Sequence, residues 1–159
     1  MTELRRDEEF YALQVFEAIK TNLNTRIAAI NAEKNDGITL RSLDSNAYYY
    51  EDFGQDQPVY DPVVIFAVNP EEAETLAGES HEELSVSIQM VISSQAVASS
   101  ETLFKTIARY RRAIKESLKA WRQKLPNYRL VGLPQMAFTA KTGTMHHVLG
   151  VGVRFKFVN

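Results

Sequence analysis

The chain has 159 residues, of which 45% are hydrophobic and 24% are charged, and it contains no cysteine. This composition predicts one soluble globular domain spanning residues 1–159, and it excludes disulfides, thiol catalysis and cysteine-based zinc sites. The formal net charge of −2 does not favour a strongly basic nucleic-acid-binding protein. No stretch approaches the roughly 18 apolar residues of a membrane span, and the N-terminal residues lack a signal-peptide core, so we expect synthesis in the cytoplasm.

The charges are segregated along the sequence. Residues 42–104 contain twelve acids and no Lys or Arg, whereas residues 105–159 contain twelve bases and a single acid, Glu116. The first 41 residues nearly balance, with six bases and seven acids. If folding keeps the acidic and basic sets on separate surfaces, copies of the chain will attract one another head to tail.

The first predicted element is a long amphipathic helix over residues 7–33. Its apolar residues fall on one face at about 100° per residue, and they are Ala12, Val15, Phe16, Ile19, Leu23, Ile27 and Ile30. Acidic residues favour the start of this helix through its dipole, and Asn35, Asp36 and Gly37 favour its end.

The next part of the chain favours strands. Residues 38–50 are ambiguous, although their three tyrosines support a strand, and residues 51–62 indicate a loop because they contain glycine and proline. Residues 63–68 form a continuous apolar run, which is expected of a central strand covered on both faces. Asn69 and Pro70, followed by acids, have the pattern of a helix start, so we expect a short helix ending near Gly78.

Residues 84–92 alternate apolar and polar side chains, which predicts a half-buried strand. A second amphipathic helix is predicted from Ser100 to a point before Pro126. Its apolar face carries Leu103, Ile107, Tyr110, Ile114, Leu118 and Trp121, and its opposite face carries Lys105, Arg109, Arg111, Arg112, Lys115, Lys119 and Arg122.

Residues 130–133 indicate another strand, and residues 149–158 alternate as a final one. The order of elements predicts an α+β fold, in which a mostly antiparallel sheet of about four to five strands carries two long amphipathic helices on one face.

The acidic segment suggests a Mg²⁺-dependent nuclease, because carboxylate clusters bind Mg²⁺ and position the attacking water. The restriction-type pattern needs a Glu-x-Lys on the strand after its Asp, but Asp61 is followed by no Lys before residue 105. A solvated acidic surface is the simpler interpretation.

Other chemical motifs are weak. His81 stands alone, and His146 and His147 would point to opposite faces of a strand, so no metal site is predicted. Gly150 and Gly152 indicate close backbone packing rather than a nucleotide site. We therefore expect no enzyme activity and no cofactor.

Two surfaces remain candidates for binding. The basic helix face could bind nucleic-acid phosphates, although a solvated or partner-facing surface is favoured because no stacking or helix-turn-helix motif accompanies it. The tyrosines at 48–50 and Tyr60, with Phe53, form either an exposed contact patch or strand core, and both alternatives stay open.

Taken in order, four elements resemble one known family. They are the helix around residues 10–30, the strand at 84–92, the helix at 103–121 and the terminal strand at 148–157. This organisation is similar to that of the tail terminator, or tail completion, proteins of tailed bacteriophages, and it covers most of the chain through the order of elements rather than a short motif.

The resemblance implies a structural protein of the virion neck, made in the host cytoplasm. In that family a ring of identical subunits, usually a hexamer, caps the head-proximal end of the tail tube, stops tube polymerisation and joins the tail to the head-side connector. The implied partners are further copies of the chain, the tail tube protein and the connector or stopper protein, with the tail sheath protein as a further candidate. DNA would pass through the channel without specific binding, and the family has no catalytic residues.

A cyclic ring needs a heterologous interface, for which opposite charges are suited. The predicted interface residues are, on the acidic and aromatic side, Asp44, Tyr48, Tyr49, Glu51, Asp52, Asp56 and Tyr60, and, on the basic helix, Arg109, Arg111, Arg112, Lys115, Lys119 and Arg122. The acids either meet the basic helix of a neighbour or line the channel. Another head–tail joining protein, such as a head-closure protein, is the first alternative, and the Mg²⁺-dependent nuclease is the second.

Overall fold

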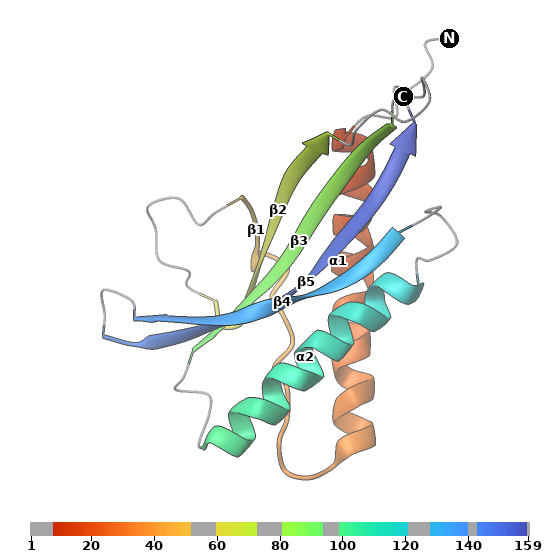
Figure 1. The fold of residues 1–159 in the computed structure, drawn as a ribbon. Helices are drawn as coiled ribbons and strands as arrows, with labels where there is room; N and C mark the ends of the chain where they lie inside the picture. Colours follow the sequence, from red (N-terminus) through yellow and green to blue (C-terminus); the bar gives the residue numbers. More distant parts are fainter. Residues whose placement is uncertain are drawn as a thin grey trace.

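The computed structural model describes residues 8–51, 60–72, 81–93, 99–120, 128–139 and 143–158. Two helices and five strands form in these ranges (Figure 1): α1 (Glu8–Lys34), β1 (Tyr48–Tyr50), β2 (Val63–Glu72), β3 (His81–Ser93), α2 (Ser100–Ala120), β4 (Tyr128–Thr139) and β5 (Met145–Val158). Neither helix within these ranges is long and apolar enough to cross a membrane.

The five strands form one mixed sheet in the order β1-β2-β3-β5-β4. β1 pairs with β2 in parallel, and the other three neighbouring pairs are antiparallel. The predicted α+β class and mostly antiparallel sheet are therefore confirmed. The central strand is β3 rather than β2, because two strands lie on each side of β3.

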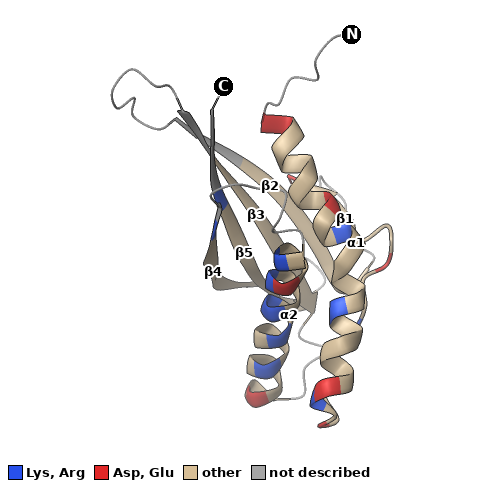
Figure 2. Ribbon diagram, turned by 90° about the vertical axis from the view of Figure 1, so that its right-hand side faces the viewer, with Lys and Arg blue, Asp and Glu red and all other residues tan. Residues whose placement is uncertain are grey.

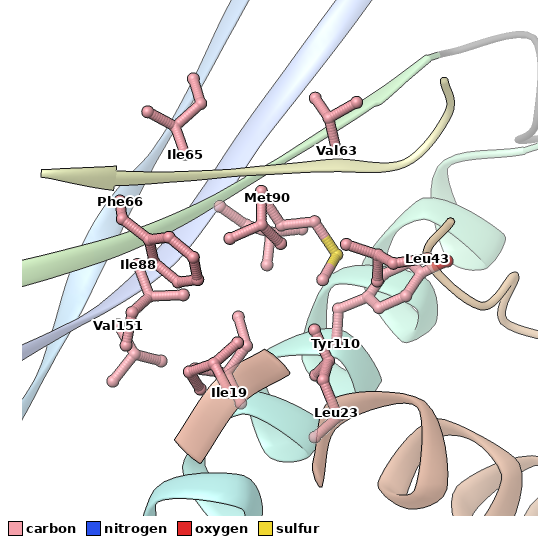
Figure 3. Close-up of a cluster of buried hydrophobic side chains, with 14 of the residues drawn as sticks. Ile19, Leu23, Leu43, Val63, Ile65, Phe66, Ile88, Met90, Tyr110 and Val151 are labelled. Carbon is pink, nitrogen blue, oxygen red and sulfur yellow. The ribbon is translucent and has the colours of Figure 1, made fainter. Parts of the chain in front are cut away.

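The core lies between the sheet and the two helices. Phe66, Ile88 and Val151 pair across β2, β3 and β5, so they lie in one row on the same side of the sheet. Figure 3 shows these side chains on the side of the sheet where residues of both helices gather, with Ile19 and Leu23 from α1 and Tyr110 from α2. The ring of Phe16 stacks on Phe66 at a centroid distance of 4.4 Å. The predicted apolar faces of α1 and α2 therefore supply the helical half of this core.

β2 is buried on both of its faces, as the continuous apolar run predicts. The exposed fractions of Val63, Val64, Ile65 and Phe66 are 1%, 0%, 9% and 1%. Figure 3 shows Val63 and Ile65 pointing away from the helices, on the side of the strand opposite Phe66.

The predicted helix start at Asn69 is wrong, because β2 continues through Glu72. Backbone pairing explains the difference: Pro70 lies opposite Leu84, and the ladder with β3 extends to the pair Glu72 and Glu82. β1 pairs with β2 up to Phe66, so no described strand covers that side of β2 at Pro70, where a missing N–H is tolerated. The remainder of the predicted helix, residues 73–80, lies outside the described residues.

β4 is longer than the predicted strand at 130–133. It continues past Pro134 through a register shift against β5 between Leu133 and Met136. Because β4 is the outermost strand, it accommodates a proline that an interior strand would not.

The predicted close packing at Gly150 is confirmed. A Cβ atom at Gly150 would lie 2.6 Å from the carbonyl oxygen of Ile88, in the central strand. A Cβ at Gly152 would meet other atoms no closer than 3.5 Å, which is an ordinary contact. The tight approach is therefore local to Gly150.

Candidate interaction surface

Two of the predicted acids flank β1 and are exposed. Asp44 lies in the turn before β1, where its Oδ1 accepts a hydrogen bond from the N–H of Asn46 at 2.9 Å. Glu51 directly follows β1 with a φ of 67°, and its N–H donates to the carbonyl of Phe66 at 2.6 Å. We call Asp44, Glu51 and β1 the acidic edge. Asp52 and Asp56 lie outside the described residues.

The tyrosines of this region differ in burial. Tyr48 stacks on Phe66 at a centroid distance of 5.8 Å, and burial raises the pKa of its hydroxyl to about 12. Tyr49 and Tyr60 are also partly buried and pack against the core. Tyr50 is 49% exposed, and its hydroxyl accepts a hydrogen bond from Lys20 at 3.2 Å. Tyr50 is thus the tyrosine best placed for an external contact, although the predicted set includes its neighbours instead.

The predicted exposure of Arg109 on the outer face of α2 is wrong, because Arg109 is 7% exposed. Its guanidinium donates to both carboxylate oxygens of Asp36 and to the carbonyl oxygen of Ile38. The hydrogen bonds from Arg109 hold the pKa of the Asp36 carboxyl well below its usual range. Asp36 lies just beyond the end of α1, so Arg109 joins α2 to the loop that follows α1.

Two further cations of α2 also pair within the chain. Arg112 donates to both carboxylate oxygens of Glu33 at 3.0 and 2.7 Å, and its Nε donates to Glu116 at 2.8 Å. Lys105 lies 2.9 Å from a carboxylate oxygen of Glu101. Figure 2 shows Lys and Arg along much of α2, as predicted. Acids of α1 and α2 pair with some of these cations and so neutralise part of the positive charge.

The remaining cations line a shallow groove beside α2. Its volume is about 510 Å³, and it is lined by Ala108, Arg111, Arg112, Lys115, Glu116 and Lys119. Arg111 is anchored there, since its Nη2 donates to the carbonyl oxygen of Leu133 in β4 at 2.6 Å. Lys115 is half-buried and Lys119 is exposed, and neither ammonium forms an ion pair with an acid that the structure describes. We call this feature the basic groove. Arg122 lies outside the described residues.

The acidic edge and the basic groove lie at opposite ends of the sheet order. β1 is the first strand of the sheet and β4 is the last. α1 is tied to the β1 end by the hydrogen bond from Lys20 to Tyr50, and α2 is tied to the β4 end by the hydrogen bond from Arg111 to Leu133. The fold therefore keeps acidic and basic surfaces apart, although fewer residues contribute to each than the sequence suggests.

Three of the residues considered for metal chemistry have structural partners. Asp61 accepts a hydrogen bond from the N–H of Ser93 at 3.1 Å, and its other oxygen lies 3.5 Å from Arg41. His146 stacks on Phe138, while His147 is 8% exposed and lies 3.5 Å from the amide nitrogen of Gln135. Within the described ranges, no group of three or more His, Asp or Glu side chains is arranged to hold a metal ion.

A second cavity, of about 400 Å³, separates the loop after α1 from the first turns of α2. Its lining includes Arg41, Asp61, Thr102, Thr106 and Tyr110. The hydroxyl of Tyr110 is already bonded to the backbone of Arg41, and the hydroxyl of Thr106 donates to the carbonyl of Thr102. Tyr110 therefore joins the loop to α2, whereas the Thr106 hydroxyl is bonded within the helix.

No protein-family model and no curated protein matches the chain. Among solved structures, it is similar to a chain in the structure entitled "Virion of native gene transfer agent (GTA) particle". The match has 15% sequence identity and covers 90% of this chain and 98% of the other chain, with a TM-score of 0.35. A TM-score this low does not establish a common fold, so we draw no functional conclusion from the likeness.

Proposed function

We propose that the chain is a structural subunit of a tailed-bacteriophage neck, which forms a ring on the head-proximal end of the tail tube. The ring would stop polymerisation of the tube and join the tail to the head-side connector. The observation that carries the proposal is the placement of exposed charges of opposite sign at the two ends of one sheet.

Such a placement suits a cyclic assembly. In a ring, each subunit presents one surface to the preceding subunit and a different surface to the next one, so the two surfaces need to complement each other rather than themselves. Asp44 and Glu51 of one copy would face Lys115 and Lys119 of its neighbour. Because exposed ion pairs contribute only about 0 to 1 kcal/mol each, these charges would orient the copies while apolar contacts hold them together.

The partners follow from the position of the ring. Its tube-side face would bind the tail tube protein, with the sheath protein as a further neighbour, and its opposite face would bind the connector or stopper protein. The channel would pass DNA without specific contacts.

Charge reversal in the basic groove tests this proposal. We expect the double variant Lys115→Glu/Lys119→Glu to lower the fraction of tail tubes that carry a terminal ring, measured by negative-stain electron microscopy, by at least about tenfold, because each like-charge contact replaces an attraction. Neither side chain belongs to an ion pair among the described residues, so we expect the variant to fold. Reversal of Arg109 or Arg112 would be a poor test, since it would disrupt the pairs with Asp36 and Glu33.

The matched control restores complementarity. Adding Asp44→Lys and Glu51→Lys to the double variant gives every copy a swapped pair of surfaces, and we expect ring formation to return. Normal capping by Lys115→Glu/Lys119→Glu, or no rescue by the swap, would contradict the proposed interface. Binding to the connector but not to tail tubes would instead favour a head-closure protein.

A further inference from the structure

Both ends of the sheet are strand edges that no described strand covers. β1 is three residues long, whereas β4 has twelve residues. The unpaired N–H and C=O groups of an edge strand are a template for another strand, so natural proteins normally protect long edges with charges, prolines or bulges.

The first half of β4 carries such protection and the second half does not. Arg129 is exposed there, the Leu133 carbonyl accepts a hydrogen bond from Arg111, and Pro134 and the register shift interrupt the strand. Residues 135–139 follow the interruption, are exposed at every position and contain no charged side chain. The structure thus leaves one uncharged stretch of edge strand open.

The same stretch exposes large apolar side chains. Met136 is 60% exposed and Phe138 is 42% exposed, and Met145, opposite Thr139 on β5, is 45% exposed. Met136 and Phe138 share one face of the β4–β5 hairpin and Met145 lies on the other, and exposed apolar side chains gathered in this way are typical of a contact surface.

We infer that residues 135–139 of β4 pair with β1 of a neighbouring copy, so that the sheet continues from subunit to subunit. This inference rests on the proposed ring and specifies its interface. Strand direction agrees with it: β1 is parallel to β2, and each further step across the sheet is antiparallel, so β4 runs opposite to β1. Copies placed side by side along the sheet keep their strand directions, and β4 therefore meets the next β1 in antiparallel orientation.

The second copy is the occupant that the chemistry favours. Phe138 and, on β1, Tyr49 both lie on the face of the sheet away from the helices, where aromatic side chains of joined strands pair well. Asp44 and Glu51 flank β1, while the basic groove lies beside β4, because Arg111 bonds to Leu133. Because β4 runs opposite to β1, this pairing would bring the Glu51 end of the acidic edge towards Leu133 and the basic groove of the next copy.

Disulfide trapping tests the pairing directly, since the chain has no cysteine of its own. Chains carrying Tyr49→Cys are mixed with chains carrying Phe138→Cys and oxidised, both at about millimolar concentration in solution and on tail tubes. We expect a crosslinked heterodimer from the mixture, and a ladder of higher oligomers from the chain that carries both substitutions. Because Tyr49 packs against the core, Glu51→Cys with Met136→Cys serves as a second pair, in the same antiparallel register and at exposed positions.

The control replaces Tyr49→Cys with Phe104→Cys, on α2, where the side chain is 72% exposed and no crosslink to Phe138→Cys is expected. Self-linking of the Phe138→Cys chain as efficient as that of the mixture would show that β4 meets β4 and would overturn the inference. Absence of crosslinks both in solution and on tubes would overturn it as well. Crosslinked ladders from a protein that does not bind tail tubes would support the sheet continuation while refuting the role in the tail.

Discussion

Gly150 has a packing role that a single methyl group tests. We expect Gly150→Ala to lower the free energy of unfolding by about 1 to 3 kcal/mol, because the new Cβ would clash with the Ile88 carbonyl in a backbone that cannot easily move. Gly132→Ala is the matched control, since a Cβ at Gly132 meets no atom within 4 Å. Urea denaturation of both variants measures the difference, and equal effects would contradict this packing role.

Tyr110 fastens the loop after α1 to α2 through its hydroxyl. This hydroxyl donates to the carbonyl of Arg41 and accepts from the N–H of Arg41, both at 3.0 Å, and burial raises the pKa of Tyr110 to about 12. We expect Tyr110→Phe to cost about 1 to 3 kcal/mol, because two backbone groups lose their partner.

The pH dependence of this contribution has a definite sign. Folding raises the pKa of Tyr110 above its ordinary value of 10.0, so the stabilisation is complete below pH 10 and is lost as the pH rises towards 12. Denaturation curves of the parent chain and Tyr110→Phe should therefore converge at alkaline pH. If the two free energies of unfolding differed by the same amount up to pH 12, the ionisation of Tyr110 would not be coupled to folding as described.

At the scale of elements, side-chain periodicity predicts four of the seven segments closely. In both helices and in the strands β3 and β5, apolar residues recur regularly over many positions, and these apolar residues form the core. The pattern fails where pairing overrides a local signal: Asn69 and Pro70 fit a helix start, yet the ladder with β3 keeps them in a strand. Pro134 likewise suggests a break, but an edge strand with a register shift continues past it.

The loop after α1 is joined to α2 by an ion pair, between Asp36 and Arg109, that the sequence does not reveal. Asp36→Asn should destabilise the fold at neutral pH, because the Arg109 guanidinium, 7% exposed, loses a charged partner. Folding lowers the pKa of Asp36, so its contribution is present above the ordinary carboxyl pKa of 3.8 and declines as the pH falls below it.

Denaturation of the parent chain and Asp36→Asn across the acidic range measures this effect. The two stabilities should approach each other on acidification. Asp44→Asn is the control, since an asparagine oxygen can still accept the hydrogen bond from Asn46. A gap between the parent chain and Asp36→Asn that widens at low pH would be the opposite of the expected sign.

At the scale of the whole molecule, folding redistributes the charges of the sequence. Glu33 and Asp36 are the only acids between residues 18 and 43, and both pair with cations of α2. The basic C-terminal segment is therefore partly neutralised by the N-terminal one, which no count along the chain can show because it depends on how the helices cross. The cations of α2 that stay available are those of the basic groove, at the opposite end of the strand order from the acidic edge.

This separation predicts how salt should act on self-association. Complementary charges mainly accelerate encounter, and salt screens them beyond a Debye length of about 8 Å at physiological ionic strength. We expect the association rate of the chain to fall about tenfold or more between roughly 0.01 and 0.5 M salt, measured by light scattering or stopped-flow fluorescence. The dissociation rate should change much less, since apolar side chains such as Phe138 and Met136 would hold the formed interface. The substitution Met136→Ala should instead act on dissociation: we expect the variant to dissociate faster than the parent chain, while its association rate keeps the same dependence on salt. If salt changed dissociation as strongly as association, ion pairs rather than apolar contacts would be holding the copies together.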